Sequence, residues 1–110
     1  MYSQYQNNFM IRFLSILLIS TFFTASNPIT SDCKCKGIPL YGKVKVVSSF
    51  PDFKVKVVNS FPDLKVKIVE NFPDECGKWK YVESFPDFTI QFVESFPDFT
   101  IKYVESFPGL

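Results

Sequence analysis

A phrase of eleven residues repeats along most of this chain, and it constrains the fold more than any other feature. Each copy alternates polar and apolar residues and ends in Phe-Pro, usually followed by Asp. The Phe-Pro pairs begin at Phe50, Phe61, Phe72, Phe85, Phe96 and Phe107. The steps between them are 11, 11, 13, 11 and 11 residues, so three copies precede a two-residue insertion and three follow it. Repetition at a fixed period indicates a fold built from one unit used several times.

The alternating part of each copy predicts a β-strand. Residues 43–47 and 54–58 both read Lys-Val-Lys-Val-Val, and residues 89–93 and 100–104 keep the rhythm with Thr, Gln and aromatic residues. A period of two is typical of a strand with one buried face. An eleven-residue period also suits a right-handed coiled coil, but a proline in every copy excludes long helices. We therefore predict an all-β fold of 11-residue strand–turn repeats, three plus three.

The Phe-Pro-Asp segments predict the turns, because Pro donates no ladder hydrogen bond and Asp favours turns. These positions are Phe50, Pro51, Asp52, Phe61, Pro62, Asp63, Phe72, Pro73, Asp74, Phe85, Pro86, Asp87, Phe96, Pro97, Asp98, Phe107, Pro108 and Gly109. We expect the six Phe rings to form the shared core, one ring per repeat. The other interpretation is an aromatic stripe on the surface that binds carbohydrate or a protein partner.

The N-terminal part has the pattern of a secretory signal peptide. A single cation, Arg12, precedes an uncharged apolar run at residues 13–23 that is too short to span a bilayer. We predict a signal peptide at residues 1–26, an irregular connector at 27–40 and the repeat domain at 41–110. After cleavage no stable membrane span would remain. The protein would be secreted or otherwise extracytoplasmic, in a periplasm or at a cell surface.

The charges are balanced overall but unequally distributed. Residues 27–69 contain eight Lys and three Asp, a net charge of +5, whereas residues 70–110 contain three Lys and eight acids, a net charge of −5. We expect the first three repeats to lie beside the last three, so that cross-strand Lys–Glu pairs set the register. Apart from Arg12 the chain has no Arg, which argues against nucleic acid as a partner.

Catalytic motifs are lacking in this sequence. The chain contains no His, no Gly-rich phosphate loop and no nucleophile–base pair, and an Asp follows Phe-Pro in five of the six copies rather than in one. A residue needed once for catalysis would not normally be copied into each turn, so we interpret the aspartates as turn formers. We expect a monomer that is not an enzyme and that uses no cofactor.

The segment Cys35-Lys36-Gly37-Ile38-Pro39-Leu40-Tyr41-Gly42-Lys43-Val44, the segment Cys76-Gly77-Lys78-Trp79 and the closing Phe-Pro-Gly resemble the septoil-knot domain proteins. The resemblance covers roughly residues 33–110. It implies a small, deeply knotted domain whose backbone traces a torus knot with seven crossings, each of two interwound circuits holding three repeats. Without the resemblance, the repeats predict a β-solenoid or a repeat-built barrel, because true knots are rare. The family has no established activity, so no catalytic residue is transferred.

Three cysteines in an exported chain predict a disulfide. Cys76 would pair with Cys35 or Cys33, and we favour Cys35 because Cys35 and Cys76 both lie in segments that carry the resemblance. Cys33 would then be free or paired with another chain, and a Cys33–Cys35 bridge is an alternative. Closing a loop of this length stabilises a domain by roughly 3–4 kcal/mol.

The aromatic residues outside the repeat, Trp79 and Tyr81, are the first candidates for a binding site. The sequence favours an exported structural domain that resists unfolding and proteolysis. The alternative is an extracytoplasmic module that binds a glycan or a surface protein through Trp79 and Tyr81.

Overall fold

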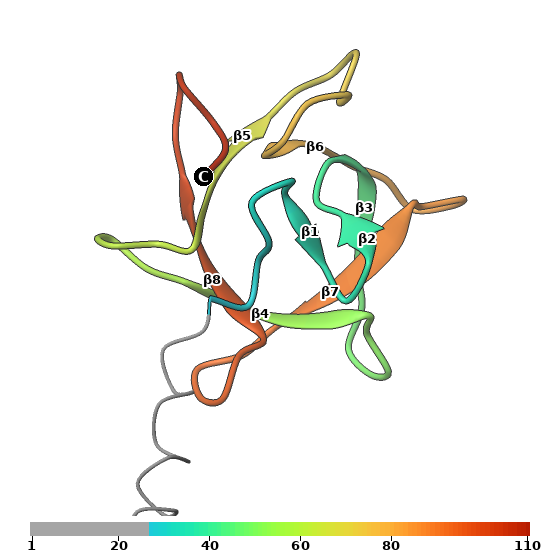
Figure 1. The fold of residues 1–110 in the computed structure, drawn as a ribbon. Coiled ribbons are helices and arrows are strands. Elements are labelled where there is room, and N and C mark those ends of the chain that lie inside the picture. The colour runs from blue at the N-terminus through green and yellow to red at the C-terminus, as the bar shows by residue number, and fades with distance from the viewer. Residues whose placement is uncertain (1–26) are drawn as a thin grey trace, which may run out of the picture.

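The computed structural model describes residues 27–110, and this part of the chain contains strands and no helix (Figure 1). The strands are β1 Lys34–Cys35, β2 Ile38–Pro39, β3 Gly42–Val46, β4 Phe53–Val57, β5 Leu64–Ile68, β6 Lys78–Tyr81, β7 Phe88–Phe92 and β8 Phe99–Tyr103. Within this range there is accordingly no helix long and apolar enough to cross a membrane. The predicted signal peptide, residues 1–26, lies outside the described residues.

Strands β3 to β8 form a closed barrel in the order β3-β6-β5-β8-β4-β7. All neighbouring strands in the barrel are parallel. Each strand from the first half of the chain has a strand from the second half on each of its edges. The prediction that the first three repeats lie beside the last three is therefore confirmed, and so is the all-β fold class.

The predicted Lys–Glu pairs are not what sets the register. Outward-facing lysines of the barrel lie opposite Thr, Gln or another Lys, as in Lys45↔Thr89, Lys54↔Gln91 and Lys43↔Lys80. The glutamates lie in the loops or turns that connect the strands, so they cannot take part in the ladder. The prediction failed because the charge count averages strands and loops together.

The alternation within the five-residue strands β3, β4, β5, β7 and β8 places their first and third residues inside the barrel, whereas in β6 the second residue, Trp79, points inward. In β4 these are Phe53 and Val55, and in β7 they are Phe88 and Ile90; all four are buried. The full set of buried apolar residues is Ile29, Cys33, Cys35, Leu40, Val44, Phe53, Val55, Leu64, Val66, Trp79, Phe88, Ile90, Phe99 and Ile101. Eight of these residues follow one pattern: Phe53, Leu64, Phe88 and Phe99 come directly after an Asp, and Val55, Val66, Ile90 and Ile101 are their i+2 neighbours.

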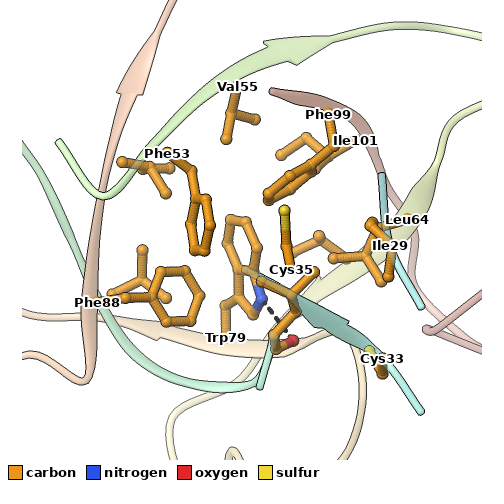
Figure 2. Packing of buried hydrophobic residues seen from close by; sticks show 14 residues of the cluster. Ile29, Cys33, Cys35, Phe53, Val55, Leu64, Trp79, Phe88, Phe99 and Ile101 are labelled. Carbon is orange, nitrogen blue, oxygen red and sulfur yellow. Dashed lines mark hydrogen bonds between the residues drawn. The ribbon is translucent and has the colours of Figure 1, made fainter. Parts of the chain in front are cut away.

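Residues 27–40, predicted as an irregular connector, pack into the core of the barrel. They contain the β1–β2 pair, and four of their apolar side chains belong to the core cluster: Ile29, Cys33, Cys35 and Leu40. Figure 2 shows Cys35 among the labelled core residues Trp79 and Phe99. We call this segment the N-terminal plug. It joins the core because its apolar residues supply the surface that the short barrel strands leave uncovered.

Candidate functional site

The Phe residues before proline lie on the surface, which corrects the prediction that they form the core. The loops that connect the barrel strands project outward from it (Figure 1), and all six Phe side chains are between 79% and 97% exposed. Their backbones adopt φ angles of 53–58°, a left-handed conformation that costs a non-glycine residue about 1–2 kcal/mol. We call these positions the Phe-Pro tips: Phe50, Phe61, Phe72, Phe85, Phe96 and Phe107, each with the proline that follows.

Four aspartates fasten these loops to the neighbouring strand of the other half. Asp52 Oδ2 accepts hydrogen bonds from Thr89 N (2.9 Å) and Thr89 Oγ1 (3.3 Å). Asp63 makes the same contacts with Thr100, at 2.9 and 3.2 Å. Two aspartates of the second half bind strands of the first half: Lys43 N donates to Asp87 Oδ2 at 2.8 Å, and Lys54 N donates to Asp98 Oδ2 at 2.7 Å. We call these contacts the aspartate clasps. They continue the strand pairing into the loops and give the repeated Asp a structural role.

The last copy of the repeat is fastened by its backbone instead. Gly109 stands where the other copies have Asp, and its N and O both bond to the backbone of Lys65 at 2.8 Å. Gly109 adopts a φ of 117°, in the region that favours glycine. The change from Asp to Gly therefore lets the backbone of the last copy pair directly with Lys65 of β5.

The two-residue insertion interrupts this pattern at Asp74. Among the contacts of residues 27–110, no hydrogen bond to the Asp74 carboxylate is formed, whereas the equivalent Asp52 and Asp63 each hold a threonine. The inserted residues lead instead to Gly77, whose N donates to Leu40 O of the N-terminal plug at 3.1 Å. A Cβ at Gly77 would collide with the Lys65 carbonyl and with Gly109 N, so this close approach requires glycine.

A groove opens beside this interruption. Its volume is about 340 Å³, and it is lined by Ile38, Pro39, Tyr41, Gly42, Pro73, Asp74 and Asp87. The lining is mainly apolar, with the two carboxylates at its polar side. The N-terminal plug supplies one wall, and the loops after β5 and β6 supply the other. The groove is therefore present once per chain, although it is built beside a repeated motif.

Trp79 is not available to a ligand, so its predicted role as a binding aromatic is wrong. Its side chain is 0% exposed, and its Nε1 donates to Leu40 O at 3.1 Å (Figure 2). It packs edge-on against Tyr81 and Phe88, with ring centroids 6.4 and 5.6 Å away. The sequence contained the reason, because Trp79 occupies the first inward position of its strand.

Tyr81 is half-buried, and its hydroxyl lies 2.7 Å from that of Tyr103. Burial, and then the hydrogen bond with Tyr103, raise the pKa of Tyr81 far above the usual value. The pair lies where β6 and β8 flank β5. Tyr81 is thus held neutral and has a structural partner, and the predicted pair of binding aromatics does not form one exposed site.

The disulfide joins Cys33 to Cys76, not Cys35 to Cys76 as predicted. Cys35 follows Cys33 by two residues but is a free thiol whose side chain lies within the core, and burial raises its pKa. The bridge connects the N-terminal plug to the insertion between the two halves. Among residues 27–110, side chains of the metal-ligating types do not gather in groups of three or more.

The two halves of the chain thus lie side by side. The Cys33–Cys76 disulfide fixes the insertion between them, and Gly109 fixes the last copy to Lys65. Residues 37–110 match the family model of the 7(1) septoil knot domain. The chain belongs to this family. No curated protein matches the septoil-knot chain.

The septoil-knot domain carries two surface features that sequence reasoning placed wrongly or missed. The regular recurrence of Phe before proline predicts a buried ring in each copy, but these rings are exposed. A second signal was present: Phe53, Phe88 and Phe99, which follow Asp directly, fit the alternation of the strands. The groove had no sequence signal, because plug and loops meet only in the folded domain.

Proposed function

We propose that this septoil-knot domain is an exported, non-enzymatic structural module that resists unfolding and proteolysis. The observation that carries the proposal is the alternation of the two halves around the barrel, in which every strand is bonded on both edges by strands of the other half. Releasing one strand therefore breaks two ladders. Resistance of this kind is kinetic, because it depends on the barrier to unfolding.

Three further features support this role. The Cys33–Cys76 bridge spans 43 residues and favours an oxidising compartment outside the cytoplasm. The predicted signal peptide agrees with such a location. In addition, every exposed tip Phe precedes a proline, and a peptide bond before proline is a poor substrate for most endoproteases.

The test is proteolysis of the purified protein with trypsin and chymotrypsin, with the disulfide intact and after reduction. We expect the oxidised domain to remain uncut within residues 41–110 for hours and the reduced domain to be cut more slowly than an unfolded chain of the same sequence. A matched control is Phe53→Ala, which weakens the core and should speed cleavage. Cleavage within the repeats of the reduced domain in minutes would rule out this role.

A second candidate function is an extracytoplasmic binding module, and the exposed Phe-Pro tips favour it. Large aromatic side chains are frequent energetic centres of interfaces. Six of them on exposed loops are costly for a protein without a partner, both in backbone strain and in exposed apolar area. The test is capture of a glycan array or of surface proteins by the wild-type domain and by a variant with all six tip Phe residues changed to Ser. Equal binding by both would exclude this candidate.

A further inference from the structure

The groove and the Phe-Pro tips are complementary in size and chemistry. A cavity of about 150 Å³ already holds a benzene ring, so a groove of about 340 Å³ has room for a Phe ring and the adjoining proline. Its wall of Ile38, Tyr41 and Pro73 is apolar and aromatic, which suits such an occupant. The groove and the Phe-Pro tips both lie on the surface of this chain.

We propose that the groove of one molecule binds the Phe50 or the Phe61 tip of a second copy of the chain. The proposal deepens the second candidate function, because it names the partner of the tips. It is independent of the proposed resistance to unfolding.

Charge selects these two tips among the six. Asp74 and Asp87 give the groove a negative side. In four tips the residue two positions before Phe is Glu, namely Glu70, Glu83, Glu94 and Glu105. In the other two it is Ser48 or Asn59, and the strands on either side of these tips have lysines as outward residues. The strands beside the Phe72 tip also have outward lysines, so at that tip Glu70 makes the difference. Like charges disfavour the four acidic tips, and the lysines favour the remaining two.

The arrangement of the loops makes the contact intermolecular. The tips project outward in different directions around the barrel (Figure 1), and the loops bearing Phe72 and Phe85 form part of the groove wall. A tip that enters a groove on another molecule makes a heterologous contact, which produces open chains unless the rotation happens to close. The same outward arrangement leaves only some of the tips within reach of a flat membrane.

The first experiment measures self-association of the chain, expressed from Met1 in an exporting host and purified as the host processes it. Sedimentation equilibrium should show a mean mass that rises steadily with concentration. In the Phe50→Ala/Phe61→Ala variant, association should be at least roughly 10-fold weaker. The matched control, Phe96→Ala/Phe107→Ala, should associate like the wild type. Because all four side chains are exposed, the near-ultraviolet spectrum of buried Trp79 should be unchanged in both variants.

The second experiment tests the charge of the groove. Asp74→Lys should weaken association several-fold, and Ser48→Glu/Asn59→Glu should weaken it by a similar factor. Combining the three substitutions places Glu opposite Lys, and should recover most of the association. A capped peptide of residues 47–52 should compete with self-association, whereas the peptide of residues 93–98, with Glu94 before its tip, should not.

A protein that stays monomeric at all concentrations would overturn the proposal, as would equal losses from the two pairs of Phe substitutions. Tips that bind lipid vesicles without self-association would replace it with a membrane role. The protease assay on the same variants separates the outcomes. Tip substitutions should leave the cleavage rate unchanged, so loss of self-association does not bear on resistance to unfolding.

Discussion

Phe50 and Phe53 lie three residues apart and have opposite surroundings. Phe50 is 96% exposed at the tip of a loop, whereas Phe53 is 0% exposed. The Phe53 ring packs edge-on against Phe88 and Phe99, with ring centroids 5.6 and 5.4 Å away (Figure 2). Phenylalanine is therefore exposed at one position of the repeat and buried at another.

The first prediction compares these two residues. Phe53→Ala should reduce the free energy of unfolding by about 3–5 kcal/mol, because it removes a buried ring and leaves a cavity. Phe50→Ala should change it by less than about 0.5 kcal/mol, because no buried area is lost. Urea unfolding followed by Trp79 fluorescence measures both. A similar loss in the two variants would contradict the assignment of tip and core.

The second prediction concerns the aspartate clasps. Asp63→Ala should destabilise the domain by about 1.5–3 kcal/mol, because it removes a charged acceptor from the backbone and side chain of Thr100. Asp74→Ala is the natural control, since it removes an equivalent residue that has no clasp. It should change stability by less than about 0.5 kcal/mol. If both variants lost the same stability, the clasps would not be the reason for the repeated Asp.

The third prediction distinguishes the two cysteines of the N-terminal plug. Non-reducing digestion and mass spectrometry should recover Cys33 linked to Cys76, and Cys35 as a thiol. In the native protein Cys35 should react with iodoacetamide much more slowly than in denaturant, because it is buried and its pKa is raised. Rapid labelling of Cys35 without denaturant, or a fragment linking Cys35 to Cys76, would contradict this arrangement.

Removing the bridge should also be costly. A Cys33→Ser/Cys76→Ser variant should lose roughly 4 kcal/mol, the chain-entropy value for a loop of this length. Its urea midpoint at neutral pH gives the comparison with the wild type.

The fourth prediction concerns alkaline pH. The folded protein keeps Tyr81 neutral, whereas the unfolded chain ionises it with a pKa of about 10. Its contribution to stability is therefore complete below about pH 10 and declines as the pH rises above that value. In Tyr81→Phe the decline in the urea midpoint between pH 8 and pH 11 should be smaller. Ultraviolet titration of the folded protein should give the same tyrosinate curve for the wild type and for this variant, because Tyr81 stays neutral while the domain is folded. Loss of a tyrosinate that forms near about pH 10 would contradict the assignment.

Most of the fold could be predicted from the repeat, because its two-residue alternation and its eleven-residue period both indicate local structure directly. Alternation identified the barrel strands, and Phe-Pro-Asp identified their ends. The position of the insertion divided the chain into two sets of three, which proved to be the two interleaved halves. The opposite charges of the two halves predicted that they lie side by side, but the Lys–Glu pairs expected from those charges do not form in the ladder. The register that places Lys45 beside Thr89 was therefore not predicted.

The misplaced residues have a common physical cause. Whether Phe50 or Phe53 is buried depends on a backbone turn with positive φ, which the residue type Phe does not reveal. Whether Cys33 or Cys35 reaches Cys76 depends on which way the N-terminal plug faces. Burial of Trp79 depends on the same plug, which accepts its indole hydrogen bond at Leu40. In each case the residue type alone does not decide the outcome, which depends on how the backbone places the side chain.

The alternation of the two halves around the barrel also limits when the protein can fold. No two of β3, β4 and β5 are paired with each other, and their partners begin only at Lys78. A nascent chain that ends before this residue therefore has no barrel ladder available to it, however much time passes. Formation of the barrel must therefore wait for the last third of the polypeptide, and the first half is made without any strand of the barrel to pair with.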